Sequence, residues 1–437
     1  MLTRDKREEM LRAELEKREI IEIARKIIRE SPGPICNHCL GRQFAKVSSG
    51  VSNERRGEVL KEILRAVGEE IESGKCWLCN GLFENDNLDE WVRAALAKLK
   101  QYEYDTFLVG TKMSGMLMEN EEMMWEIAGA LFAEPLKAEL NREVGKRIEQ
   151  ETGKRVDFDT PEVVVILNLW SGDFDVELQV KPLFIYGRYR KYRRGIPQTR
   201  WFCRACHGKG CERCNFTGKM YAESVEELIK GSIMDVYGAE DVILHGCGRE
   251  DIDARMLGSG RPFVVELRAP KRRQRVDLHA LEEKVNEENR AKLEVTNLKY
   301  VNREMVARIK NANARKTYRM RVELRGAVTE SELREAVQEL DGAVIEQRTP
   351  LRVVHRRADL IRSRRIYGMK LLNYGGSTCE LEVKCDGGLY VKELISGDRG
   401  RTRPNLSDLL GIEAEVKELD VIDVELDTGH EITEATR

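Results

Sequence analysis

Cysteine spacing constrains the fold of this 437-residue chain more than any other feature of the sequence. Eight of the eleven cysteines stand in four pairs, and two residues separate the cysteines of each pair. Two thiolates at that spacing can bind the same ion, so two pairs complete the closed tetrahedral site of structural zinc. Gly208 and Gly210 allow a tight reversal between the third and fourth pairs. The sequence therefore predicts one or two structural zinc ions, bound by Cys36, Cys39, Cys76 and Cys79, and by Cys203, Cys206, Cys211 and Cys214.

The simpler interpretation of these cysteines is burial or redox chemistry. His38 lies between Cys36 and Cys39 and could be a spare ligand, but four thiolates already fill the coordination shell. Because neither site leaves an open coordination position, both are predicted to be structural and not catalytic. The other cysteines are expected to pack in the interior; they are Cys247, Cys379 and Cys385.

Basic residues are concentrated in a few stretches, although the net charge is only −2. Residues 181–200 contain seven lysines and arginines and no acid, and residues 348–365 contain seven arginines opposed by Asp359 alone. Such stretches favour a track that binds the phosphates of a nucleic acid, and the alternative is a solvated face. No apolar run approaches the ~20 residues that span a bilayer, and the charged N-terminus lacks the apolar core of a signal peptide. We therefore expect a cytoplasmic protein without a membrane segment, and no obligate protein partner is evident.

The order of helical and strand-like segments predicts an α+β protein with a mixed sheet in three domains. Residues 1–86 form a helical region that carries the first four cysteines. Residues 87–184 alternate between helices and strands. Residues 185–437 combine many strands with shorter helices, and the second cysteine group is inserted there at 203–214.

Some individual elements are predicted sharply enough to compare with a structure. Residues 1–30 are typical of one highly charged helix with an apolar stripe. A long helix is expected over residues 121–151, bent or broken before Pro135. The apolar run at residues 162–170 and the alternating run at residues 175–180 are predicted to be partner strands.

A short acidic loop with glycines separates two predicted strands, Asp241–Leu244 and Pro262–Leu267. Gly246 and Gly248 would allow a tight turn and the close approach of a ligand. Such a loop can hold one reactive carboxylate between two strands, and Asp251 is the candidate. The simpler interpretation is a polar turn that caps a helix.

Several segments resemble the RNA pseudouridine synthases. The run Gly248–Phe263 opens with the Gly-Arg-x-Asp arrangement that carries the nucleophilic aspartate of those enzymes. Lys316–Arg319 offers a tyrosine, Leu389–Leu394 offers a lysine two residues after a tyrosine, and Gln347–Arg357 is similar to a thumb loop that clasps RNA. Phe107–Lys112 and its surroundings look like a THUMP domain, an RNA-binding module. Over nearly the whole chain, the order and spacing resemble the THUMP-containing tRNA pseudouridine synthases of the Pus-ten family.

This resemblance implies an isomerase that converts uridine to pseudouridine in the T-loop of tRNA, at position 55 and also at position 54 in tRNA numbering. It implies a pseudouridine synthase domain at residues 185–437, a THUMP-like domain at residues 87–184, and no organic cofactor. Asp251 would be the nucleophile, Lys392 its ion-pair partner, and Tyr318 would stack on the flipped base and help to move a proton. The other residues expected to bind tRNA are Tyr390, Arg249, Arg352, His355, Arg356 and Arg357.

The chemistry of these residue types agrees with such a reaction. A carboxylate can attack the sugar or the base of a uridine without a cofactor, and a basic neighbour favours its ionised form. Extruding the base costs a few kcal/mol, which contacts of the thumb and groove must offset. Basic and aromatic residues alternate over Tyr186–Arg194, so arginines and lysines are expected to meet phosphates while tyrosines stack on exposed bases.

Each assignment has a simpler competitor. Tyr318 and Tyr390 could be ordinary interior aromatics, and Lys392 could be a solvated helix residue. Asp253 and Glu250 are expected only to cap or to pair with the arginines nearby in sequence, Arg249 and Arg255.

Two other functions remain possible from the sequence. The first is a non-catalytic RNA-binding protein that uses zinc knuckles and a THUMP domain. The second is a THUMP enzyme of another chemistry, but the sequence contains no P-loop and no strand followed by Gly-x-Gly-x-x-Gly. A zinc deaminase would need His-x-Glu beside a cysteine pair and an open zinc position, and neither cysteine group has them.

Overall fold

The computed structural model describes residues 4–170, 173–273 and 276–426, except for the side chains of residues 4, 5 and 356. The chain divides into two compact units, with the boundary between Lys181 and Pro182. The division into three domains stays a prediction.

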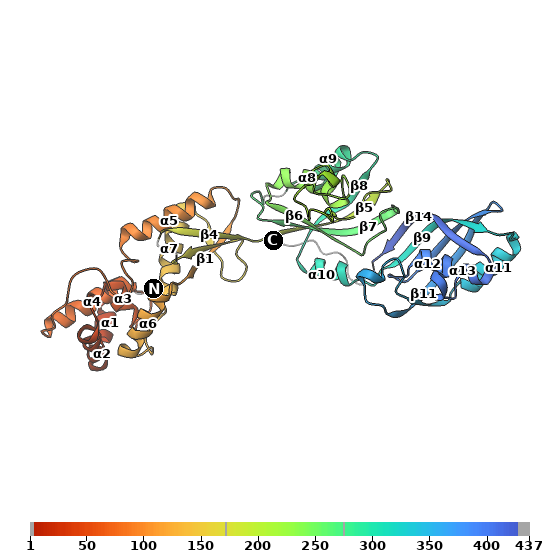
Figure 1. Cartoon of the computed structure of the whole chain (residues 1–437). Helices are drawn as coiled ribbons and strands as arrows, with labels where there is room; N and C mark the ends of the chain where they lie inside the picture. The colour runs from red at the N-terminus through yellow and green to blue at the C-terminus, as the bar shows by residue number, and fades with distance from the viewer. Residues whose placement is uncertain (1–3, 171–172, 274–275, 427–437) are drawn as a thin grey trace. The chain divides into compact units, whose positions relative to one another are not determined.

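Helices form the first part of the N-terminal unit (Figure 1). They are α1 (Arg4–Leu15), α2 (Arg18–Glu30), α3 (Asn37–Arg42) and α4 (Asn53–Ala66). The single helix expected over residues 1–30 is two helices, because the backbone is extended at Lys17, with φ −59° and ψ 134°. Ile20, Ala24 and Ile27 recur at helical spacing and are buried, so the apolar stripe faces the core.

A four-stranded sheet with the order β2-β1-β3-β4 forms the second part of this unit. The elements are α5 (Asn85–Leu99), β1 (Thr106–Lys112), α6 (Gly115–Ala128), α7 (Leu136–Thr152), β2 (Arg155–Val156), β3 (Val163–Asn168) and β4 (Asp175–Val180). β3 and β4 are antiparallel neighbours, which confirms the predicted pair. The helix expected over residues 121–151 is divided between α6 and α7, and Pro135 directly precedes α7, where it interrupts no helical hydrogen bond.

A ten-stranded mixed sheet forms the C-terminal unit, in the order β13-β10-β11-β12-β9-β14-β7-β5-β8 with β6 paired to β7. The strands are β5 (Leu183–Lys191), β6 (Asp241–Gly246), β7 (Arg255–Arg268), β8 (Leu293–Val301), β9 (Arg315–Arg325), β10 (Val344–Arg348), β11 (Ile361–Tyr374), β12 (Thr378–Cys385), β13 (Thr402–Arg403) and β14 (Glu413–Glu425). The helices are α8 (Val225–Tyr237), α9 (Leu278–Glu288), α10 (Glu304–Asn311), α11 (Glu330–Leu340), α12 (Val391–Ser396) and α13 (Leu406–Leu410). α8 and α9 pack on β6 and β8, whereas α11 and α12 pack on β11 and β14 (Figure 1). The predicted α+β class with a mixed sheet is confirmed.

The strand β14 joins the two halves of this sheet. It pairs antiparallel with β9 along its length, and it pairs parallel with β7 at Asp420 and Val421. The half formed by β5 to β8 carries the loop with Asp251, and the half formed by β9 to β13 carries Tyr318 and Lys392. The predicted site residues therefore come from both sides of the β14 seam.

Two of the three tyrosines in the run Tyr186–Arg194 are not available for stacking on bases; Tyr192 is exposed, and the prediction for it stays open. β5 lies between β7 and β8, and both Tyr186 and Tyr189 are buried. Arg188 and Arg190 donate hydrogen bonds to main-chain carbonyl groups of β7. The prediction that Tyr186 and Tyr189 stack on bases is wrong, because they lie three residues apart, on opposite faces of a strand inside the sheet, and both faces are covered there.

No helix within the described residues has both the length and the apolar character that crossing a membrane requires.

Candidate active site

A cavity of about 670 Å³ opens over the β14 seam of the C-terminal unit. The loop between β6 and β7 forms one wall, and the start of β9 and the residues leading into α12 form others. The loop between β10 and β11 contributes Arg352, Val353 and Arg357. Four segments that are distant in sequence thus enclose one space, and Asp251 and Lys392 both line it.

Glycine and two hydrogen bonds fix the path of the loop between β6 and β7. Gly248 has a φ of +74°, a conformation that favours glycine. The carbonyl of Gly248 accepts a hydrogen bond from Gln198 Nε2 at 3.0 Å, and the carbonyl of Cys247 accepts one from Arg261 at 2.7 Å. The loop joins two strands and caps no helix, so the interpretation as a helix cap is wrong.

Glu250 attaches the loop between β6 and β7 to the strands of the sheet. Its side chain is fully buried, and Arg261 forms an ion pair with it at 2.8 Å. The hydroxyl of Tyr189 donates a hydrogen bond to the Glu250 carboxylate at 2.8 Å, and Lys191 Nζ lies 3.8 Å from that carboxylate. Burial alone would raise the pKa of Glu250, but the charges of Arg261 and Lys191 outweigh it and hold the pKa below its ordinary value. The expectation that Glu250 only caps or pairs with Arg249 or Arg255 is wrong, because its partners come from strands.

Asp251 points the other way, into the cavity. One carboxylate oxygen lies 3.5 Å from Lys392 Nζ and 3.4 Å from a guanidinium nitrogen of Arg352. Its side chain is 35% exposed, so a ligand can reach it. Lys392 also binds Asp253 at 2.7 Å. Burial opposes ionisation of Asp253, but the hydrogen bond and charge of Lys392 lower its pKa. Asp253 therefore does not pair as expected, and Arg255 binds Asp420 instead.

The two predicted aromatic residues line the same cavity. Tyr318 lies on β9, and burial raises the pKa of its phenol. Tyr390 directly precedes α12, and its main-chain N–H and C=O both bond to the side-chain amide of Gln347. The guanidinium of Arg352 lies 5.8 Å from the Tyr390 ring centroid, and Arg357 donates to the Tyr390 hydroxyl at 3.1 Å. The loop between β10 and β11 therefore holds Tyr390 in place.

The remaining residues predicted to bind RNA are Arg249, His355 and Arg356, and not all of them line the cavity. Arg249 lines the cavity, with its guanidinium 5.1 Å from the ring centroid of Trp201. His355 is exposed in a 3₁₀ turn, and it is not among the described residues that line the cavity. The side chain of Arg356 lies outside the described residues.

Sequence reasoning missed two features of the cavity, the buried partners of Glu250 and the side chain of Lys316. Lys316 is buried and lines the cavity beside Tyr318. Its position two residues before Tyr318 on a predicted strand places both side chains on one face, which was a usable signal. The partners of Glu250 come from β5 and β7, and no local spacing connects them to the loop.

The first cysteine group has the geometry of a tetrahedral metal site. The sulfur atoms of Cys36, Cys39, Cys76 and Cys79 all lie within 4.8 Å of one another. Cys36 and Cys79 are 3.8 Å apart, close to the about 3.8 Å between thiolates that a tetrahedral ion with Zn–S bonds of about 2.3 Å requires. The described residues therefore fit zinc.

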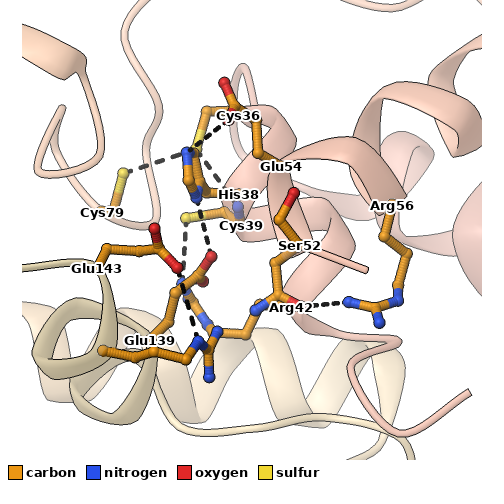
Figure 2. Close-up of polar contacts among 12 residues, drawn as sticks. Cys36, His38, Cys39, Arg42, Ser52, Glu54, Arg56, Cys79, Glu139 and Glu143 are labelled. Carbon is orange, nitrogen blue, oxygen red and sulfur yellow. Dashed lines mark hydrogen bonds and ion pairs between the residues drawn. The ribbon is translucent and has the colours of Figure 1, made fainter. Parts of the chain in front are cut away.

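Buried polar groups surround this first group (Figure 2). Arg42 donates to the Cys39 sulfur at 3.6 Å and to Glu139 of α7 at 3.3 Å. His38 bonds to Glu139 through Nδ1 at 2.8 Å and stacks on Phe83. His38 is therefore held by α7 and is not needed as a fifth ligand. Through Arg42 and His38, the cysteine group is linked to α7.

The second cysteine group closes within a dozen residues. Its sulfur atoms lie 3.7–3.9 Å apart in three pairs, which again suits zinc. Gly208 and Gly210 have φ values of +93° and +89°, so the predicted tight reversal is made by glycines. The cysteines outside both groups are buried and free, as expected for packing residues; they are Cys247, Cys379 and Cys385.

Comparison with known proteins agrees with this architecture. Residues 184–425 match the family described as Pus10, C-terminal, and residues 91–168 match the Pus10 THUMP domain, archaeal. A protein named tRNA pseudouridine synthase Pus10 from Methanothrix thermoacetophila is 49% identical, covering 93% of this chain and 94% of the relative. The protein of the same name from Methanopyrus kandleri is 43% identical, covering 90% of this chain and 96% of the relative. A solved Cbf5-Nop10-Gar1 complex is 19% identical over 46% of this chain and 45% of that chain, with a TM-score of 0.30, a likeness too weak to support a conclusion. The family matches and the relatives together show that the chain belongs to the Pus10 family of tRNA pseudouridine synthases.

Proposed function

We propose that this protein isomerises uridine to pseudouridine in tRNA with Asp251 as the nucleophile. One observation carries the assignment of the residue. Asp251 faces a cavity that can admit a nucleoside, with two cations within 3.5 Å, whereas its neighbour Glu250 is sealed in the interior. The family supplies the reaction, and this geometry supports Asp251 over Glu250 as the nucleophile.

The cations support the proposed chemistry. Lys392 and Arg352 both lie within 3.5 Å of one carboxylate oxygen of Asp251 and can hold it in position, and a carboxylate can act as a nucleophile without a cofactor. The carboxylate attacks C1′ of the extruded nucleotide as the bond between C1′ and N1 breaks. The uracil then turns, and the bond between C1′ and the carboxylate breaks as C5 joins C1′. The proton on C5 is then lost and N1 gains one, so no atom or electron is added overall. Tyr318 and Tyr390 would bound the base within the cavity.

The substrate position follows from the family and not from the cavity. The resemblance supports uridine 55 of the T-loop, and also uridine 54. The thumb loop, including Arg357 and His355, would hold the extruded loop of the RNA. The THUMP domain and the first cysteine group, which belong to the N-terminal unit, would provide further contacts with tRNA.

Zinc is proposed at both cysteine groups as a structural ion. When bound, it would supply cross-links between segments and no reactive group, because four thiolates leave no open position. Cys36 to Cys79 would tie α3 to the segment before α5, and Cys203 to Cys214 would close the knuckle between β5 and α8.

The decisive experiment compares two neighbouring carboxylates. Asp251→Asn should abolish isomerisation of unmodified tRNA labelled with tritium at C5 of uridine, because release of tritium requires the new bond at C5. The affinity for tRNA should change little, since the substitution removes no phosphate contact. Mapping of pseudouridine in the product would show which positions react.

Asp253→Asn is the matched control, because Asp253 binds the same lysine at a shorter distance. It should lower the rate only partly, through a shifted Lys392. Wild-type turnover in Asp251→Asn, with loss of activity in Asp253→Asn, would transfer the nucleophile to Asp253. An inactive wild-type protein that still binds tRNA would favour a non-catalytic RNA-binding protein.

A further inference from the structure

Lys316 is a buried cation in the cavity. It lies at the start of β9, only 9% of its surface is exposed, and it lines the same cavity as Asp251 and Tyr318. Among the described residues, its ammonium group forms no hydrogen bond and no ion pair. A charged group in this position loses part of its hydration and gains no fixed partner in return, which is unfavourable. A fold retains such a group when a ligand provides the partner.

The other buried cations of this region have partners. Arg261 pairs with Glu250 at 2.8 Å, and Lys191 donates to the carbonyl of Ile196 at 2.7 Å. Because Glu250 is already engaged by Arg261, Lys191 and Tyr189, its carboxylate has no exposed face for Lys316. Lys316 is thus the exception among the buried cations around this loop.

The surroundings direct the ammonium of Lys316 toward the loop that carries the nucleophile. A Cβ built on Gly248 would lie 2.9 Å from Lys316 Nζ, so the amine lies directly against the loop at that glycine. Cys247, Cys385, Arg261 and Glu250 are the titratable groups that face it from the neighbouring segments. Burial, followed by the charge of Arg261, lowers the pKa of Lys316 to about 8. At neutral pH the side chain is therefore mostly protonated.

The proposed reaction creates a charge that this cation can stabilise. When the bond between C1′ and N1 breaks, the electron pair stays with the uracil, whose carbonyl oxygens then carry negative charge. The two cations beside Asp251 are occupied by carboxylates: Arg352 by Glu393 at 2.6 Å, and Lys392 by Asp253 at 2.7 Å. Arg249, Lys310 and Arg357 also line the cavity, but Lys316 is the cation among these described residues whose side chain is buried, and no carboxylate pairs with it.

We propose that Lys316 donates a hydrogen bond to a carbonyl oxygen of the detached uracil and stabilises its negative charge until C5 joins C1′. The ammonium keeps its proton throughout, and the proton released from C5 is balanced by the proton gained at N1. This inference rests on the proposed function. It assigns a catalytic residue beyond the nucleophile, its basic partner and the tyrosine.

The test is Lys316→Met, measured by tritium release under single-turnover conditions with saturating enzyme. Loss of one preorganised donor to a developing charge lowers the rate by about 10²–10³-fold, whereas the Kd for tRNA should stay within about threefold because the charge arises only after binding. Lys384→Met is the matched control. Lys384 stands beside Thr317 on β12, so it faces the opposite side of the sheet, and its amine binds Glu425. This control should keep the wild-type rate.

The outcomes separate the inference from the proposed function. An inactive wild-type protein would overturn both, whereas an active wild type with a Lys316→Met rate within threefold of it would overturn the role of Lys316 alone. A variant that binds tRNA much more weakly but reacts at the wild-type rate when saturated would also overturn it, because that lysine would hold a phosphate in the ground state.

A second variant distinguishes loss of the cation from misfolding. Lys316→Ala leaves space for a small amine, so added ethylammonium should restore part of the lost rate and ethanol should not. A rate that ethylammonium leaves unchanged, or that ethanol raises equally, would overturn the cationic role.

Discussion

Replacing Glu250 by glutamine should damage the fold far more than the chemistry. In the wild type, Glu250 neutralises Arg261 and Lys191 in a site from which water is excluded. Glutamine keeps the shape and the contact with Tyr189 but leaves two buried cations without a counter-charge. Breaking a buried pair in this way costs about 3–5 kcal/mol. For a unit of this size, such a loss lowers the Tm by roughly 10 °C.

The assay is thermal or urea unfolding of the whole chain, followed through the transition of the C-terminal unit. Glu323→Gln is the matched control, because Glu323 pairs with Lys417 and Arg325 while 38% exposed. A solvent-exposed pair of this kind contributes little to stability, so the control should unfold almost like the wild type. Equal losses in the two variants would refute the reasoning from burial.

The lowered pKa of Glu250 fixes how its contribution to stability changes with pH. Because the pKa of Glu250 is lowered in the folded protein, its contribution is complete above the unfolded pKa of about 4.3 and is lost as the pH falls through the lower folded pKa. The stability difference between wild type and Glu250→Gln should therefore be full at pH 7 and shrink in acid. A difference that stays constant down to pH 3 would contradict the pairing.

Three further predictions concern the cations and the metal sites. Lys392→Met should lower the rate of tritium release by about 10–100-fold and not abolish it, because Arg352 remains 3.4 Å from Asp251; a rate as low as that of Asp251→Asn would contradict this shared role. Metal analysis of the purified protein should find two zinc ions per chain, and a strong chelator should lower the Tm of both units; fewer than one zinc per chain would overturn the metal assignment. Arg42→Met should weaken zinc binding by about 10–100-fold in competition with a chelating dye, and an unchanged affinity would show that its bond to the Cys39 sulfur is dispensable.

Local patterns predicted much of the fold. The paired strands at residues 163–168 and 175–180 and the helix after Pro135 follow from alternation and from the chemistry of proline. The cysteine groups were predictable because metal-binding spacing is short-range. The Asp251 loop was predictable because glycines and acids lie together in one run.

Features that depend on burial by distant segments could not be predicted from local sequence patterns. The run Tyr186–Arg194 fits both an RNA-stacking surface and a strand inside a sheet, and only the neighbours β7 and β8 decide between them. In the same way, Glu250 and Asp251 are adjacent in sequence and look equivalent, yet one is sealed beside Arg261 and the other faces solvent. The partner of a buried charge lies on a distant segment, so spacing along the sequence does not predict it.

The seam made by β14 sets an order of events during protein synthesis. The half-sheet with Asp251 and the half-sheet with Lys392 are connected by strand pairing only through residues 413–425 within the described chain. Each half has its own cluster of buried residues, and β14 completes both, with Val421 and Val424 in one and Ala414 and Leu419 in the other. The two halves of the reactive centre come into register only after the last of these strands has left the exit tunnel.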